Sequence, residues 1–168
     1  MENATLFGVI STTENSSNND ILDGDSNNNN KNNGRFIMVL DDDFDIVFPI
    51  KRGLQRNGYT VFAFTDPHLA LEHFKINSSK YYLVISDLRM PSMNGLEFLK
   101  NVKRIRSDIK IFLMTAFEIA DLKSSIESLK IDEFFVKPFS IGELNATINN
   151  YYRIKKSELY KETVDSLE

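Results

Sequence analysis

Residues 36–42 read FIMVLDD, an apolar run that stops abruptly at two carboxylates, Asp41 and Asp42. A run of five apolar residues is the length of a short buried strand. An acidic pair directly after such a strand lies at its carboxyl end. If other strands of the chain end in the same way, their polar residues meet at one edge of a sheet.

The pattern of residues 36–42, a short apolar run that ends at a polar residue, recurs along the chain. Four further apolar runs follow, at 60–64, 82–86, 110–115 and 133–137. They are nearly continuous, as expected for parallel strands that are covered on both faces. Between them, apolar residues recur at helical spacing, as in Ile46, Ile50 and Leu54. The strict alternation predicts an α/β fold, a (βα)₅ doubly wound parallel sheet.

Polar side chains also end three of the later runs. Asp87 follows the third run, Thr115 ends the fourth and Lys137 follows residues 134–136 of the fifth. Open parallel sheets carry their functional site outside the carboxyl ends of the strands. With Asp41 and Asp42, these residues form a set of three carboxylates, a hydroxyl and an ammonium. Such carboxylates require a cation, and oxygen-only ligation favours Mg²⁺. The set therefore predicts a site for a divalent metal and a phosphoryl group, which a carboxylate can itself accept.

Helix-capping signals agree with this alternation. Asp66 precedes Pro67, as an N-cap precedes a proline at the first helical position, and residues 140–143 fit a capping box. Asp43 is interpreted as a cap or turn residue. Pro49 lies inside the first helical pattern, so we expect that helix to begin near Asp45 or Ile46, which leaves the proline in the first turn.

Three regions differ in composition. Residues 1–34 contain ten Asn and the whole net charge of −4, which predicts a disordered tail. Residues 35–152 form the expected domain, and residues 153–168 a charged extension of the last helix. The chain has no excess of basic residues, so its composition does not indicate nucleic-acid binding. No apolar run approaches the roughly 20 residues of a membrane span. The first residues do not resemble a secretion signal, so we expect a cytoplasmic protein.

The motifs at the strand ends resemble the receiver domain of two-component response regulators. Residues 39–43 (VLDDD) resemble its first acidic motif, and residues 87–95 (DLRMPSMNG) its phosphoacceptor loop. Residues 114–116 (MTA) resemble its fourth strand end, and residues 134–139 (FFVKPF) its fifth-strand motif. The match covers roughly residues 35–152. It implies a flavodoxin-like sheet with strand order 2-1-3-4-5.

The resemblance also implies a role for each residue of the site. Asp87 would accept the phosphoryl group from a histidine kinase or phosphotransfer protein. Asp41, Asp42 and Asp87 would hold Mg²⁺, with the backbone carbonyl of Arg89 as a further ligand. The remaining roles concern the phosphoryl oxygens and the switch: Thr115 and Lys137 would bind the oxygens, and Thr115 and Phe134 would form the switch. The family often has Tyr where this chain has Phe134, so a hydroxyl contact is lost.

The expected function is a phosphorylation-dependent signalling module that catalyses only its own phosphorylation and dephosphorylation. Phosphorylation would draw Thr115 inward and change the face formed by the fourth helix, the fifth strand and the fifth helix. That face would bind an unidentified target protein or a second copy, giving a monomer or weak dimer. About 16 residues follow Tyr152, so we expect no output domain.

Two alternatives remain at this point. Residues 41–43 (DDD) could serve a phosphatase of the haloacid dehalogenase type, with Asp41 as nucleophile and Asp43 as general acid. A late acidic pair for Mg²⁺ is missing from that pattern. The chain could also be a receiver-like scaffold that binds partners without phosphorylation. The complete polar set argues against a scaffold, which has no need for such repulsion.

Overall fold

The computed structural model describes residues 36–116 and 128–165, with side chains up to Arg153. The expected tail at 1–34, and most of the helix expected between the fourth and fifth apolar runs, lie outside these residues. The strands and the first three helices belong to one compact unit that ends at Lys137, and helix α5 (Ile141–Asp165) belongs to a second. The candidate site lies entirely in the first unit.

The first unit is a five-stranded parallel sheet with strand order β2-β1-β3-β4-β5, which confirms the predicted topology. The apolar runs form the strands almost to the residue. The bounds are β1 Phe36–Leu40, β2 Thr60–Phe64, β3 Tyr81–Asp87, β4 Lys110–Thr115 and β5 Glu133–Val136.

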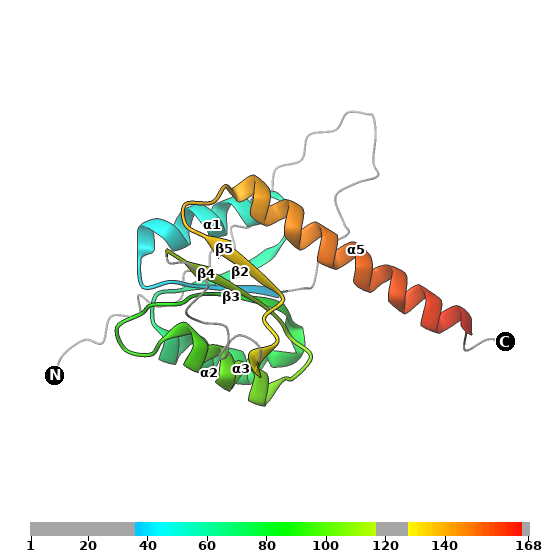
Figure 1. Cartoon of the computed structure of the whole chain (residues 1–168), viewed down its shortest axis with the longest axis horizontal. Coiled ribbons are helices and arrows are strands. Elements are labelled where there is room, and N and C mark those ends of the chain that lie inside the picture. The colour runs from blue at the N-terminus through cyan, green and yellow to red at the C-terminus, as the bar shows by residue number, and fades with distance from the viewer. Residues whose placement is uncertain (1–35, 117–127, 166–168) are drawn as a thin grey trace, which may run out of the picture. The chain divides into compact units, whose positions relative to one another are not determined.

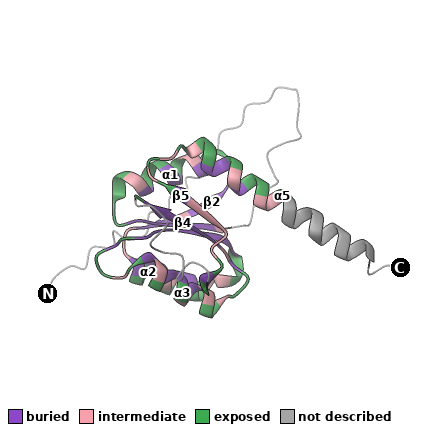
Figure 2. Cartoon of the chain, viewed as in Figure 1, coloured by how far each residue is buried: buried purple, intermediate pink, exposed green. Residues whose placement is uncertain are grey.

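Helices cover both faces of this sheet. Helix α1 (Phe44–Arg56) lies on one face, and α2 (Pro67–Asn77) and α3 (Gly95–Ile105) lie side by side on the other (Figure 1). A short 3₁₀ helix, η1 (Ser78–Lys80), leads into β3. The central strand β3 is buried at every position, and Figure 2 shows the strands buried between helices whose outer faces are exposed.

The core between the sheet and helices α2 and α3 is built from large side chains. Met38 and Leu40 of β1, Phe74 of α2 and Phe98 of α3 are fully buried in this cluster. Each such side chain stabilises the fold by roughly 1.5–3 kcal/mol relative to an exposed one. The apolar stripes on the helices and the continuous apolar strands therefore hold the strand ends in a fixed register.

Helix caps follow the predicted signals, with one correction. The Asp66 carboxylate accepts hydrogen bonds from the first turn of α2, and Ser140 and Glu143 exchange the two hydrogen bonds of a capping box. Asp43 caps α1, as predicted. Helix α1 begins at Phe44, one residue before the expected start near Asp45, and the expected place of Pro49 in the first turn was wrong. Pro49 therefore lies inside the helix, beyond its first turn.

Candidate functional site

The site is set by the register of the strand ends. Asp87 pairs in register with Met114, and Thr115 pairs with Val136, the residue before Lys137. Two backbone hydrogen bonds continue this pairing beyond the strands. The Leu88 amide donates to the Met114 carbonyl at 2.9 Å, and the Lys137 amide donates to the Thr115 carbonyl at 2.7 Å. Residues that are far apart in the sequence thus reach one edge of the sheet.

Asp41 is held in place on the β1 side of this edge. Its backbone amide donates to the Phe64 carbonyl, and its Oδ1 accepts a hydrogen bond of 3.0 Å from the Asp43 amide. The residue is 1% exposed. Burial raises the pKa of Asp41, and the hydrogen bonds from Lys137 and Asp43 only partly offset that effect. Asp41 is therefore a carboxylate that benefits from a neighbouring cation.

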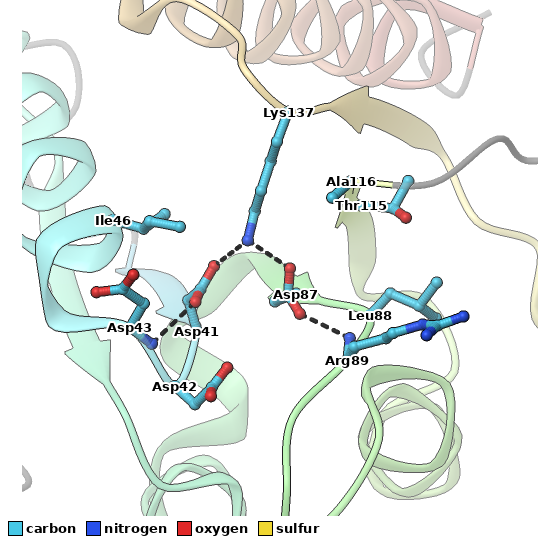
Figure 3. Close-up of a pocket in the computed structure, with 10 residues that line it drawn as sticks. All are labelled: Asp41, Asp42, Asp43, Ile46, Asp87, Leu88, Arg89, Thr115, Ala116 and Lys137. Carbon is cyan, nitrogen blue, oxygen red and sulfur yellow. Dashed lines mark hydrogen bonds and ion pairs between the residues drawn. The ribbon is translucent and has the colours of Figure 1, made fainter.

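Lys137 supplies that cation and bridges two carboxylates. Its Nζ lies 2.6 Å from Asp41 Oδ2 and 2.5 Å from Asp87 Oδ1, as Figure 3 shows. Burial alone would lower the pKa of Lys137, but its hydrogen bonds and ion pairs with both carboxylates outweigh burial and raise it. The second oxygen of Asp87, Oδ2, accepts a hydrogen bond of 2.6 Å from the Arg89 amide.

These residues surround a pocket of about 280 Å³ at the strand ends (Figure 3). Six of the seven predicted site residues line it: Asp41, Asp42, Asp87, Arg89, Thr115 and Lys137. Phe134 does not line the pocket. It is partly buried on β5 and packs against the core cluster.

The donor set of the pocket fits Mg²⁺ in its chemistry. Asp41, Asp42 and Asp87 offer oxygen atoms only, which a hard divalent cation prefers. In the present arrangement, however, no three acidic or histidine side chains of the described segments are grouped closely enough to hold a metal ion. The Lys137 ammonium lies between Asp41 and Asp87 instead. A metal ion that used both carboxylates would displace it.

Sequence reasoning missed two residues that touch the backbone of Asp87. The Ser86 hydroxyl donates to the Asp87 carbonyl at 2.9 Å. Gly95 lies against the same carbonyl, so closely that a Cβ at position 95 would stand 1.9 Å from its oxygen. The glycine was part of the quoted loop motif, but no sequence pattern indicated where its backbone would pack.

Comparison with known families agrees with the fold. The model of the response regulator receiver domain family matches residues 37–149, which is well over half of the chain. The chain therefore belongs to the response regulator receiver domain family. Receiver domains are signalling modules rather than enzymes that turn over a separate substrate.

Two curated relatives illustrate the range of lengths. Sporulation initiation phosphotransferase F of Bacillus subtilis is 28% identical over 72% of this chain and 96% of its own length. The transcriptional regulatory protein PhoP of the same organism is 31% identical over 70% of this chain but 48% of its own length. The chain thus spans about half of this second relative, and about a quarter of the transcriptional regulator ZraR of Klebsiella oxytoca.

Solved structures give the same result. The response regulator TrrA of Thermotoga maritima, in complex with Mg²⁺ and BeF, is 33% identical. It matches with a TM-score of 0.60 over 69% of this chain and 97% of that one. A receiver domain from Clostridium thermocellum is 27% identical and matches with a TM-score of 0.67 over 73% and 97% of the two chains.

Within the described residues of the present chain, no helix is long and apolar enough to cross a membrane.

Proposed function

We propose that Asp87 accepts a phosphoryl group from a phosphohistidine, in a histidine-to-aspartate phosphorelay, and that this changes partner binding. The observation that carries the proposal is the position of the Asp87 carboxylate, paired with Lys137 in the same pocket as Asp41, Asp42 and Thr115. A phosphoryl group transferred to Asp87 would meet the Lys137 ammonium within that pocket, which Thr115 also lines. Phosphoryl transfer depends mainly on such positioning and charge neutralisation.

In the transfer, one carboxylate oxygen of Asp87 attacks phosphorus. A P–O bond forms, the P–N bond to imidazole breaks, and its electron pair returns to the imidazole nitrogen. The products are an acyl phosphate on Asp87 and a free histidine, whose ring takes up a proton from water. Lys137 leaves its pairing with the carboxylate and follows the charge onto a phosphoryl oxygen.

Asp41, Asp42, Asp87 and the Arg89 carbonyl would hold Mg²⁺. When bound, the metal would neutralise the charge that gathers on the phosphoryl oxygens. Asp41 is suited to this role because its backbone and one oxygen are already fixed by hydrogen bonds. Lys137 and a metal ion would bind the same two carboxylates, those of Asp41 and Asp87. We therefore expect the ammonium to move away from Asp41 when the metal binds.

The switch would start at Thr115. This residue is 1% exposed at the end of β4, and Figure 3 draws its hydroxyl on the side away from Lys137. A phosphoryl group would draw the hydroxyl inward, and the Phe134 ring would turn into the space that this opens. Phe134 is suited to such a movement because it is only partly buried. A weak dimer through the altered face stays a prediction, which light scattering before and after phosphorylation tests.

A phosphatase that uses Asp41 as nucleophile is the weaker candidate. Its general acid would be Asp43, but the Asp43 carboxylate is occupied as the cap of α1, where it accepts a hydrogen bond of 2.8 Å from the Asp45 amide. A phosphorylation-independent scaffold is also weaker, because the Asp41–Lys137–Asp87 cluster would serve no purpose in it.

Phosphorylation of the whole chain by phosphoramidate, with and without Mg²⁺, tests the proposal. Mass mapping after borohydride reduction should find the label on Asp87 of the wild type only when Mg²⁺ is present. Asp87→Asn should remain unlabelled, while Asp43→Asn serves as the matched control and should label normally. Label on Asp41 would support the phosphatase instead, and an unlabelled wild type would support the scaffold.

A further inference from the structure

A buried hydroxyl lies directly before the proposed phosphoacceptor. Ser86 is 0% exposed near the end of β3. In the sheet register it is flanked by two apolar residues, Leu40 of β1 and Leu113 of β4. Burial of a hydroxyl among apolar groups costs free energy unless the hydroxyl finds a hydrogen-bond partner. The partner that it uses is therefore informative.

That partner is the backbone carbonyl of Asp87. The Ser86 Oγ donates to this oxygen at 2.9 Å. The backbone of Gly95 packs against the same oxygen, at a distance that leaves no room for a Cβ. The Asp87 carbonyl is thus held by a donor and by a close steric contact, and its peptide cannot rotate without losing one or meeting the other.

The N–H of the same Asp87–Leu88 peptide and the carbonyl of the following Leu88–Arg89 peptide are fixed as well. The Leu88 amide donates to the Met114 carbonyl at 2.9 Å, and the Leu88 carbonyl accepts from the Gly95 amide at 2.8 Å. The chain then returns to its own side chain, because the Arg89 amide donates to Asp87 Oδ2 at 2.6 Å. The Arg89 N–H belongs to the Leu88–Arg89 peptide, and its direction depends on the Asp87–Leu88 peptide before it, whose carbonyl Ser86 holds.

We infer that Ser86 is a positioning residue for phosphorylation of Asp87. Its hydroxyl orients the Asp87 peptide so that Oδ2 stays bound to the Arg89 amide while Oδ1 faces Lys137. This orientation presents the carboxylate to an incoming phosphorus in one fixed geometry, which lowers the entropic part of the barrier. The inference rests on the proposed function, and Ser86 itself touches no reacting atom.

Three substitutions of the full chain test the inference. Ser86→Ala removes the hydroxyl, Ser86→Cys replaces it with a weak donor of nearly the same size, and Ser86→Thr retains it. With phosphoramidate and saturating Mg²⁺, we expect the Ala and Cys variants to lose about fivefold in maximum rate, equivalent to about 1 kcal/mol. The half-saturating donor concentration should not change. The Thr variant should recover most of the rate.

A second readout separates positioning from general stability. The nuclear magnetic resonance signal of the Arg89 amide reports its hydrogen bond to Asp87 directly, and it should move upfield in the Ala and Cys variants but not in Thr. Val84→Ala is the matched control, since Val84 is 0% exposed in the same strand. It should lower the free energy of unfolding and leave both the rate of the folded protein and the Arg89 signal unchanged.

The outcomes distinguish this inference from the function on which it rests. Labelling of Asp87 at the wild-type rate in the Ala and Cys variants overturns the role of Ser86 and leaves the proposed function intact. The inference also fails if the rate falls but the Arg89 signal stays in place, or if Val84→Ala slows labelling equally. An unlabelled wild type would instead overturn the proposed function.

Discussion

The contact between Gly95 and the Asp87 carbonyl makes a sharp prediction for Gly95→Ala. A Cβ at position 95 would lie 1.9 Å from the Asp87 oxygen, 2.9 Å from the Asp87 carbonyl carbon and 3.0 Å from the Cα of Leu88. All three atoms belong to the backbone, so no side chain can turn aside. Because Cβ atoms essentially never come within 3.0 Å of such neighbours, the backbones must separate by more than about 1 Å.

The cost has two parts. Overpacking of a fixed interior costs roughly 1–3 kcal/mol. The separation also breaks or stretches the hydrogen bond of 2.8 Å between the Gly95 amide and the Leu88 carbonyl, which is worth about 1 kcal/mol. We therefore expect Gly95→Ala to lower the free energy of unfolding by about 2–4 kcal/mol. The displaced Asp87 backbone should also slow phosphorylation of the molecules that remain folded.

Urea denaturation followed by circular dichroism measures the first effect, and phosphoramidate labelling per folded molecule measures the second. Gly142→Ala is the matched control, since a Cβ there would meet only the Ser140 Oγ at 3.7 Å. In helix α5 that change should be neutral or stabilising by up to about 1 kcal/mol. A Gly95→Ala variant as stable as the wild type would refute the reasoning. Normal labelling by a destabilised variant would refute only the effect on Asp87.

Three further predictions concern other charged or strained residues. Lys137→Met leaves two buried carboxylates without their shared ammonium, so urea denaturation should show that the free energy of unfolding falls by about 3–5 kcal/mol. Mg²⁺ should restore part of this loss. An unchanged free energy of unfolding would contradict the ion pairs of Lys137 with Asp41 and Asp87. Burial, assisted by the positive charge of Lys80, lowers the pKa of His73 from its usual value of 6.5. The contribution of the neutral His73 ring to the free energy of unfolding should therefore be fully present above about pH 6.5 and should be lost as the pH falls through the lowered pKa. This pH dependence should disappear in His73→Gln and remain in His68→Gln. Lys130 has a left-handed backbone with φ of 48°, so Lys130→Gly should raise thermal stability by up to about 1 kcal/mol, and an equal gain in Lys130→Ala would argue against backbone strain as the cause.

Much of the architecture could be predicted because its causes are local. Five short apolar runs separated by helical patterns became five parallel strands with almost the predicted bounds. The caps at Asp43, Asp66 and Ser140 follow from side chains that bond to amides two or three residues away. Pro49 was misplaced because the helix start depends on its cap at Asp43, not on where the proline is best tolerated.

The sequence by itself determined which polar side chains end the strands, since each directly follows or ends an apolar run. Only the tertiary structure decided how they meet. The bridge from Lys137 to Asp41 spans 96 residues, so it exists only once β1, β3 and β5 are in register. The contact of the Gly95 backbone with the Asp87 carbonyl, which also accepts the hydrogen bond from Ser86, likewise depends on the path of the loop after β3. Close backbone packing of this kind leaves no periodic trace in a sequence, and we infer that it orients the carboxylate of Asp87.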